Sequence, residues 1–157
     1  MIKASGAFIT YKNKILMLHR DNNPEIPNPD CWQFIGGQTE GNETYEETAR
    51  REIKEETNLE ISELIPIGEI IDKNLLEYFL YYVELSDEEL KNIKLGNEGQ
   101  ELKFFSVDEM KNLKMSVGVR IYYDSYRAGM KKLLEEKVVD KNALGFNKDG
   151  KCYLGFL

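Results

Sequence analysis

The chain has 157 residues, of which 28 are acidic and 21 are basic, and its formal net charge is −7. This length predicts a single domain spanning residues 1–157, and the 41% apolar content argues against disorder. The acidic balance argues against nucleic acid or an anionic membrane as a partner, because phosphates attract basic surfaces. No apolar run approaches the roughly 20 residues of a membrane helix, and the N-terminus lacks a secretory signal core. We therefore expect a cytoplasmic protein. Its oligomeric state is expected to be a monomer or a homodimer.

Two cysteines, Cys31 and Cys152, and one histidine, His19, limit the available chemistry. Two cysteines make no disulfide framework, and there is no Cys-x-x-Cys pair to suggest a zinc site. A single histidine argues against histidine-rich metal centres and histidine-based triads. A metal bound by this chain would therefore be a hard ion held by oxygen ligands.

The first forty residues are predicted to be mainly β. Residues 7–11 and 15–20 are short runs with strand propensity. Residues 21–30 contain three of the four prolines, which predicts a loop without regular hydrogen bonding. A strand at 32–35 is expected to break at the Gly36-Gly37 pair.

A helix is predicted over residues 44–57. Thr44 and Glu47 have the spacing of a capping box at its start, and Asn58 fits a left-handed residue at its end. The following elements are expected to be strands at 61–71 and 75–85, a short helix from 86, a strand at 102–107, a helix from about 108 and an amphipathic helix at 119–137. The tail, about 143–157, is expected to form a hairpin around a turn at 147–151. This order of elements predicts a layered α+β fold.

Eight glutamates lie between residues 40 and 60, against three basic residues. A solvated helix face with ion pairs is one interpretation. However, Glu52, Glu55 and Glu56 fall within an arc of roughly 100°, on the side of the residues that would anchor the helix to a core. Glu52 and Glu56 also repel each other at a spacing of four residues. The three carboxylates are therefore predicted to lie at the edge of the core.

Carboxylates in such a place have raised pKa values unless a cation neutralises them, and oxygen ligands at this density suit Mg²⁺ or Mn²⁺. The Gly36-Gly37 pair would let the backbone approach a ligand closely and direct a carbonyl at a metal. A simple turn is the alternative interpretation of the glycines. Together, the acids and the glycines predict a divalent-metal site.

These residues resemble the Nudix box, Gly-x5-Glu-x7-Arg-Glu-U-x-Glu-Glu-x-Gly-U, in which U is aliphatic. The matching run is Gly37-x5-Glu43-x7-Arg51-Glu52-Ile53-x-Glu55-Glu56-x-Asn58-Leu59. Asn58 replaces the usual glycine, and asparagine also tolerates a left-handed helix end. The resemblance implies a Nudix-type α/β/α sandwich with a mixed β-sheet.

The resemblance also implies roles for the box residues. Glu55 and Glu56 would be metal ligands, and Glu52 would be a ligand or the base that orients water. Arg51 would position Glu52, and the Gly37 carbonyl would complete the coordination sphere. The metal would neutralise phosphate charge and lower the pKa of bound water.

A second match lies outside the box. The run Asn97-Glu98-Gly99-Gln100 is similar to a loop of mutator-type nucleoside triphosphate pyrophosphohydrolases, in which the glutamate reaches the metal. Glu98 is therefore expected to be a catalytic and metal-binding residue. A solvated loop glutamate is the alternative for Glu98, and Glu101 is the neighbouring candidate.

Three residues are candidates for binding the substrate. Arg20 could pair with a phosphate, although a surface arginine at a strand end is the alternative. Trp32 and Phe34 could stack on a base, although aromatic residues in such a strand commonly belong to the core. No sequence tag of a particular Nudix subgroup is complete.

The resemblance implies divalent-metal-dependent hydrolysis of a phosphoanhydride bond in a nucleoside diphosphate linked to another group X. Such a substrate would be a nucleoside triphosphate, an oxidised dNTP or another nucleoside diphosphate derivative. One alternative is a non-catalytic Nudix-fold sensor that binds a nucleotide or ADP-ribose. The other is an acidic α+β domain without an active site.

Overall fold

The computed structural model describes residues 1–73 and 76–155. Its strands are β1 (Ile2–Tyr11), β2 (Lys14–His19), β3 (Trp32–Gln38), β4 (Ile65–Asp72), β5 (Leu76–Glu84), β6 (Glu101–Phe105) and β7 (Lys151–Leu154). Its helices are α1 (Tyr45–Thr57), α2 (Asp87–Leu90), α3 (Val107–Met110) and α4 (Val117–Glu136). The first residue of the predicted strand at 75–85 and the last two residues of the predicted tail lie outside the described residues.

The strands of the described chain form one mixed sheet with the order β6-β2-β3-β1-β5-β4-β7. β1 is parallel to β5 and β4 is parallel to β7, whereas the other neighbours are antiparallel. β3 pairs with β2 through residues 32–34 and with β1 through residues 35–38. The glycine pair therefore lies where β3 has passed from one neighbour to the other.

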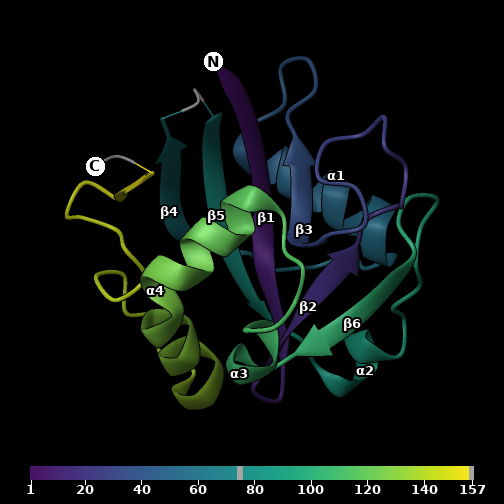
Figure 1. The fold of residues 1–157 in the computed structure, drawn as a ribbon. Coiled ribbons are helices and arrows are strands. Elements are labelled where there is room, and N and C mark those ends of the chain that lie inside the picture. The colour runs from purple at the N-terminus through teal and green to yellow at the C-terminus, as the bar shows by residue number, and fades with distance from the viewer. Residues whose placement is uncertain (74–75, 156–157) are drawn as a thin grey trace.

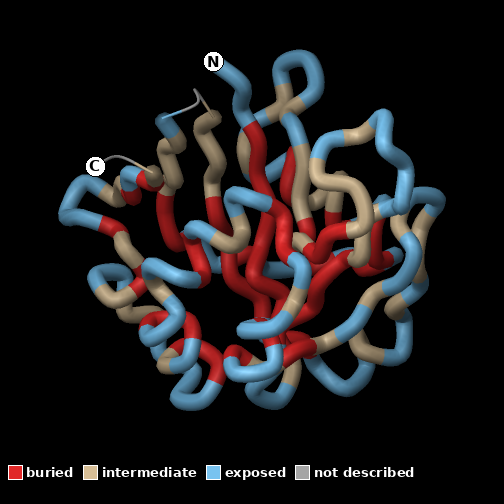
Figure 2. The backbone as a smooth tube through the Cα atoms, viewed as in Figure 1, coloured by how far each residue is buried: buried red, intermediate tan, exposed pale blue. Residues whose placement is uncertain are grey.

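A helix covers each face of this sheet (Figure 1). On one face, Ala49 and Ile53 of α1 are fully buried in a cluster with Ile35 of β3. On the other face, α4 packs against β1, with Tyr122 and Phe8 in the same cluster. Buried residues follow the centre of the sheet and exposed residues cover the outside (Figure 2). The predicted α+β, α/β/α fold is confirmed.

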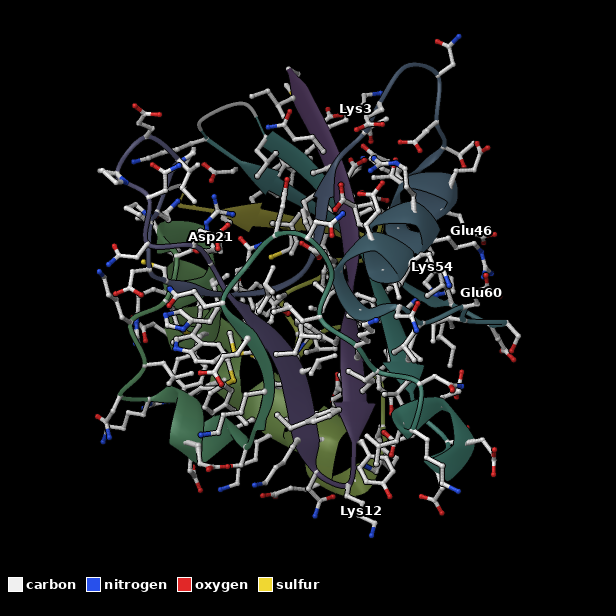
Figure 3. All side chains as sticks on the ribbon, turned by 90° about the vertical axis from the view of Figure 1, so that its right-hand side faces the viewer. Lys3, Lys12, Asp21, Glu46, Lys54 and Glu60 are labelled. Atoms are coloured by element: carbon white, nitrogen blue, oxygen red, sulfur yellow. The ribbon has the colours of Figure 1, made fainter. Side chains whose placement is uncertain are left out.

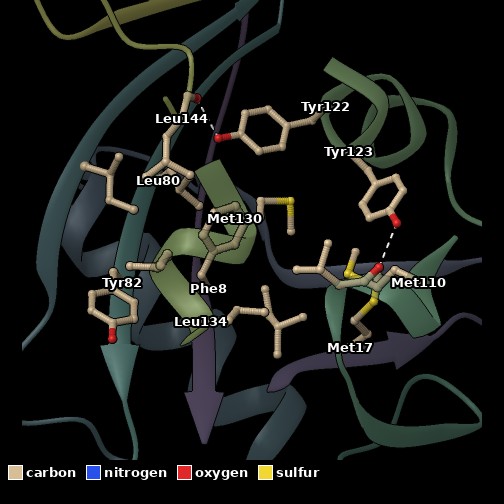
Figure 4. Packing of buried hydrophobic residues seen from close by; sticks show 14 of the residues in the cluster. Phe8, Met17, Leu80, Tyr82, Met110, Tyr122, Tyr123, Met130, Leu134 and Leu144 are labelled. Atoms are coloured by element: carbon tan, nitrogen blue, oxygen red, sulfur yellow. Dashed lines mark hydrogen bonds between the residues drawn. The ribbon is translucent and has the colours of Figure 1, made fainter. Parts of the chain in front are cut away.

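Two buried tyrosines attach α4 to its surroundings (Figure 4). The Tyr122 hydroxyl donates to the Leu144 carbonyl at 2.7 Å, and the Tyr123 hydroxyl donates to the Val107 carbonyl at 2.6 Å. Both phenols thus keep a hydrogen bond while their rings fill the core. No helix in the described part of the chain has the length and apolar character needed to cross a membrane.

The starts of the helices differ in how their N–H groups are satisfied. Thr44, Ser86 and Ser106 each accept a hydrogen bond from the third residue of their helix in a complete capping box. Ser116, which precedes α4, makes no such side-chain bond. Asn58 ends α1 with a left-handed backbone (φ 67°), and its N–H donates to the Lys54 carbonyl. The predicted start and end of the helix at 44–57 are confirmed.

Several predicted element boundaries are wrong. The strand predicted at 7–11 begins at Ile2, because residues 2–10 all pair with β5. β3 does not break at the glycine pair but continues to Gln38, because residues 35–38 pair with β1. The strand predicted from residue 61 begins at Ile65, since the Arg50 guanidinium donates to the carbonyls of Ile61 and Ser62 instead. The strand predicted at 102–107 ends at Phe105, because Ser106 caps α3.

The predicted tail hairpin is also wrong. Leu144 and Phe146 are buried, and the backbone between Asp140 and Phe146 forms turns rather than a strand. The expected turn does form, with the Asn147 N–H donating to the Lys151 carbonyl at 2.9 Å. However, β7 pairs with β4 in parallel at the edge of the sheet. β7 thus pairs with β4 at the edge of the sheet and not with residues 144–146 of the tail.

Candidate functional site

The centre of the site is the contact between α1 and the glycine pair of β3. The Gly36 N–H donates to Glu56 Oε1 at 2.9 Å. A Cβ atom at residue 37 would lie 2.4 Å from Glu52 Oε1, so only glycine leaves room for this carboxylate. The glycine pair thus lies directly against two acids of the helix. That the backbone here approaches a ligand and that the Gly37 carbonyl is directed at a metal stay predictions.

Burial controls the charge of these two carboxylates. Glu56 is 8% exposed, and this burial, reinforced by the Glu52 charge, raises its pKa to about 8. Burial also raises the pKa of Glu52, although the adjacent Arg51 guanidinium opposes the rise. The upward shifts predicted for carboxylates at the edge of the core are present at Glu52 and Glu56. The same prediction is wrong for the position of Glu55, whose side chain is 57% exposed because it projects from α1 toward solvent. A bound cation would favour the ionised form of Glu52 and Glu56.

Arg51 binds several oxygen atoms around the site. Its Nε and Nη2 donate to the two Glu43 oxygens at 2.7 and 2.9 Å, which lowers the pKa of Glu43 to about 2. Its Nη1 donates to Glu52 Oε1 at 2.9 Å and to Glu55 Oε2 at 3.3 Å. A further bond joins Nη2 to the Gln38 carbonyl. Arg51 therefore connects the end of β3 to the acidic side of α1.

The outer side of α1 has a different character. Glu46 and Lys54 of α1, and Glu60 just beyond the end of the helix, point away from the strands (Figure 3). Glu46 pairs with Arg50 at 3.3 Å on this exposed side. The interpretation of the segment as a solvated helix face with ion pairs therefore holds for the outer side of α1. Glu47 closes the capping box by accepting from the Thr44 N–H. The helix thus has a solvated acidic side and a half-buried acidic side.

The loop that carries Glu98 runs beside the C-terminal half of α1. A Cβ atom at Gly96 would lie 1.9 Å from the Glu55 carbonyl oxygen. Beyond Glu98, the Gly99 N–H donates to Asp21 Oδ2 at 3.2 Å, and Gln100 Nε2 donates to Asp30 Oδ1 at 2.8 Å. The loop is therefore attached both to α1 and to the proline-rich loop.

The two candidate glutamates of this region lie in different surroundings. The Glu98 charge contributes to the raised pKa values of both Glu52 and Glu56. Glu101 instead lies in β6, with its carboxylate 4.0 Å from His19 Nδ1. Of the two, Glu98 is the one placed within electrostatic reach of the box acids.

The donor set fits a hard divalent cation in its chemistry. Glu52, Glu55, Glu56 and Glu98 offer only oxygen atoms, and burial together with the charges of neighbouring glutamates raises the pKa of Glu52 and of Glu56. Across the described residues, no three acidic, histidine or cysteine side chains stand close enough together to hold a metal ion as they are arranged. Binding of an ion would therefore require some of these side chains to move closer together.

A cavity of about 600 Å³ adjoins the glycine pair on the α4 side of the sheet. Its walls include Arg20, Phe34, Gly36, Gly37, Tyr78 and Ser116. The Arg20 guanidinium is held at this wall by the Gln33 side chain at 2.9 Å and the Pro27 carbonyl at 3.0 Å. This cavity has the size of a ligand pocket.

The three predicted substrate-binding residues have different positions. Arg20 and Phe34 line the cavity, and the Phe34 ring packs edge-on against Phe8 at 4.9 Å. Trp32 does not line it: it is 9% exposed, stacks on His19 at 4.5 Å and contacts Phe105. The expectation that Trp32 stacks on a base is therefore replaced by a core role, because both of its neighbours are protein rings.

The predicted site residues do not include two hydroxyl-bearing residues of the cavity wall, Tyr78 and Ser116. Tyr78 extends from β5 so that its hydroxyl lies against Gly6 and Gly36, which are paired across β1 and β3. Burial and the charges of Glu56 and Glu52 raise the pKa of this phenol, so it stays protonated. Its position depends on three strands that are distant in sequence, so no local motif reveals it.

A family model described as NUDIX domain matches residues 2–125. The chain belongs to the Nudix family. The membership predicted from the box is confirmed, and so is the fold. The second half of α4 and β7 lie beyond the matched segment.

Two curated proteins and one solved structure show how this Nudix chain relates to others. It is 32% identical over 112 residues to an ADP-ribose pyrophosphatase of Methanocaldococcus jannaschii. This match covers 70% of this chain and 64% of that protein. It is 38% identical over 73 residues to a dihydroneopterin triphosphate diphosphatase of Haemophilus influenzae, covering 44% and 43% of the two chains. A NUDIX hydrolase structure from Nitrosomonas europaea covers 87% of this chain and 71% of its own, with TM-score 0.65 and 24% identity.

Proposed function

We propose that this Nudix protein is an enzyme that hydrolyses a phosphoanhydride bond in a nucleoside diphosphate linked to another group, with Mg²⁺ or Mn²⁺. The observation that carries the proposal is the packing of Glu52 and Glu56 against Gly37 and Gly36, beside a cavity that contains Arg20. This arrangement gathers metal-binding oxygens, a cation for phosphate and room for a ligand. A surface helix needs none of these features.

The proposed metal ligands are Glu52, Glu55, Glu56, Glu98 and the Gly37 carbonyl. A divalent ion at this place would neutralise phosphate charge and lower the pKa of a bound water. The residues of the chain supply the remaining chemistry. Glu52 and Glu98 are the proposed catalytic carboxylates. Burial raises the pKa of Glu52, which makes this carboxylate a better acceptor of a proton from an attacking water.

Arg51 is proposed as a positioning residue. Its two bonds to Glu43 fix the guanidinium, and its Nη1 then holds Glu52 Oε1 at 2.9 Å. This restrains the proposed base beside Gly37. Arg20 and Phe34 are the proposed substrate-binding residues, with the Arg20 guanidinium suited to phosphate oxygens.

ADP-ribose is the first substrate to test, because a curated relative is an ADP-ribose pyrophosphatase. The assay incubates the protein with ADP-ribose, nucleoside diphosphate sugars, nucleoside triphosphates and an oxidised dNTP, each with Mg²⁺ or Mn²⁺. Products are identified by mass spectrometry. We expect Glu55→Gln to lower the rate on the best substrate by at least about 100-fold.

Glu60→Gln is the matched control, because Glu60 lies on the outer side of the same segment and pairs with Lys54 at 3.6 Å. It should leave the rate unchanged. A wild-type rate no higher than that of Glu55→Gln on every compound would contradict the proposal. Tight binding of a nucleotide without turnover would instead support the alternative of a non-catalytic sensor.

We further propose that the whole chain, residues 1–157, is one Nudix domain. Supporting this, Met130 and Leu133 of α4 and Cys152 of β7 belong to the same buried cluster as Phe8 of β1. The segment beyond the family match therefore shares the core of the matched segment. A cytoplasmic location, a small nucleotide as the partner and a monomeric or homodimeric state stay predictions.

A further inference from the structure

Ser116 differs from the other residues that precede helices in this chain. Thr44, Ser86 and Ser106 all use their side-chain oxygen to cap the helix that follows. Ser116 precedes α4, which at 20 residues is the longest of the described helices, yet its hydroxyl caps nothing. Serine is among the residues most favoured at this position because of that bond. The missing bond therefore calls for a physical reason.

The Ser116 hydroxyl is buried without a hydrogen-bond partner. The residue is 8% exposed, and its Oγ is the buried side-chain atom found unpaired among the described residues. Such a group carries a desolvation cost that nothing in the protein offsets. Ser116 also lines the cavity beside the glycine pair. A serine hydroxyl changes direction by rotation about the Cα–Cβ bond, and the adjoining cavity is the space that can hold a partner for it.

The backbone next to Ser116 adds further donors. Val119 and Gly118 also line the cavity, and their N–H groups belong to the first turn of α4, where no earlier turn supplies an acceptor. The Val117 N–H is already used by Asn28 Oδ1 at 3.2 Å. A Cβ atom added at Gly118 would meet nothing within 4 Å, so the space next to this turn is open. This end of the cavity is therefore polar and accessible.

Aromatic rings line another part of the cavity. Phe8, Phe34 and Tyr122 all contribute to it. Phe8 packs against Phe34 at 4.9 Å and against Tyr122 at 5.9 Å, and the Tyr122 hydroxyl is already bonded to the Leu144 carbonyl. These rings offer faces and edges for stacking rather than hydrogen bonds. A planar ring with a polar edge matches both parts of the cavity.

We propose that Ser116 is a specificity-determining residue, whose hydroxyl hydrogen-bonds the polar edge of the nucleobase of the substrate in this cavity. The proposal rests on the proposed function, which supplies the nucleotide and places its phosphates at the glycine pair and Arg20. The base lies among the aromatic rings, and its edge faces Ser116 and the first turn of α4. Binding of the base then satisfies the hydroxyl that the free protein leaves unpaired.

The test measures the affinity of the wild-type protein and two variants for AMP, GMP, CMP, UMP and ribose 5-phosphate by calorimetry. Ribose 5-phosphate keeps the sugar and phosphate but has no base. We expect at least one nucleotide to bind the wild type about tenfold more tightly than ribose 5-phosphate. Ser116→Ala should lower the affinity for that nucleotide by roughly five- to tenfold, which is the effect of losing one hydrogen bond. The affinity for ribose 5-phosphate should stay unchanged.

Ser106→Ala is the matched control, because Ser106 caps α3 through the Glu109 N–H at 3.1 Å. It should leave all affinities unchanged and lower the melting temperature by a few degrees. Ser116→Ala should leave the melting temperature of the ligand-free protein unchanged or raise it, since it removes an unpaired buried hydroxyl. The two variants should thus separate binding from stability.

Two results would overturn the proposal. One is a Ser116→Ala protein that melts lower, as a lost cap would, and binds every nucleotide as the wild type does. The other is a wild-type protein that binds no nucleotide more tightly than ribose 5-phosphate. If no compound is hydrolysed but base-dependent binding is lost in Ser116→Ala, the proposed function fails and the role of Ser116 stands.

Discussion

The two acidic sides of α1 show how the same residue type acquires different chemistry. On the outer side, Glu46 pairs with Arg50 at 3.3 Å, and the Glu46 side chain is 56% exposed. On the inner side, Glu56 is 8% exposed and accepts a hydrogen bond from the Gly36 backbone. Solvent screens the first pair, so it adds at most about 0.5 kcal/mol to stability. Burial makes the second carboxylate costly to ionise, which is the condition under which a cation binds with most effect.

The largest structural perturbation of the inner side is expected from Gly37→Ala. The new Cβ would lie 2.4 Å from Glu52 Oε1, so the carboxylate must move. Because Glu52 is a flexible side chain, the fold should tolerate the change while the site does not. We expect hydrolysis to fall by about 10- to 100-fold, with a melting temperature within a few degrees of the wild type.

Gly41→Asn is the control for this change. Gly41 lies in the connection to α1 with φ 53° and no neighbour within 4 Å of an added Cβ, and asparagine accepts this backbone conformation. Activity should be unchanged. Equal losses in the two variants would show that β3 and its connection are merely sensitive to substitution, and that the Gly37–Glu52 contact has no special role.

A second difference between the two sides should appear in the dependence of stability on pH. Because the pKa of Glu56 is raised to about 8 in the folded protein, the folded state holds a proton that the unfolded state releases near its ordinary pKa of 4.5. This contribution to stability is complete below pH 4.5 and is lost as the pH rises to about 8. Between about pH 5 and 8, the melting temperature of the metal-free wild type should therefore fall further than that of Glu56→Gln.

Glu46→Gln supplies the comparison from the outer side, and its melting curve should follow the wild type across the same range. Addition of Mg²⁺ should raise the melting temperature of the wild type more at pH 8 than at pH 6, since the ion competes with the proton on Glu56. Parallel pH curves for the wild type and Glu56→Gln would show that Glu56 is not buried as described.

The smallest effect is expected at the end of the helix. Asn58 stands where the Nudix box usually has glycine, with φ 67° and its Nδ2 donating to the Asn92 carbonyl at 3.1 Å. Asn58→Gly should change the free energy of unfolding by less than about 0.5 kcal/mol and leave hydrolysis unchanged. A chemical denaturation curve measures this. A loss above about 1.5 kcal/mol would mean that the side-chain bond holds the end of α1 in place.

The parts of the molecule that local sequence determines were predicted well. The capping box at Thr44, the helix and its left-handed end at Asn58 depend on residues within one short segment, and so does the side of the helix that carries Glu52 and Glu56. Even the raised pKa values follow from that local pattern and one assumption about burial.

The features that local sequence does not determine depend on contacts between distant segments. β7 pairs with β4 about 80 residues earlier, so a nearby turn wrongly suggested a hairpin. Trp32 is covered by Phe105 of a strand far along the chain, and Tyr78 reaches Gly36 only because β1 lies between their strands. The unpaired hydroxyl of Ser116 has no sequence signature, since serine before a helix ordinarily predicts a cap.

The most direct test of the account compares Glu56→Gln with Glu46→Gln in Mg²⁺-dependent hydrolysis of the best substrate from the panel. Both variants replace a carboxyl group by an amide on the same helix, one on each side. We predict a loss of at least about 100-fold for Glu56→Gln and no change for Glu46→Gln. Equal rates for the two variants would contradict the claim that burial against the glycine pair makes the inner side of α1 the active site.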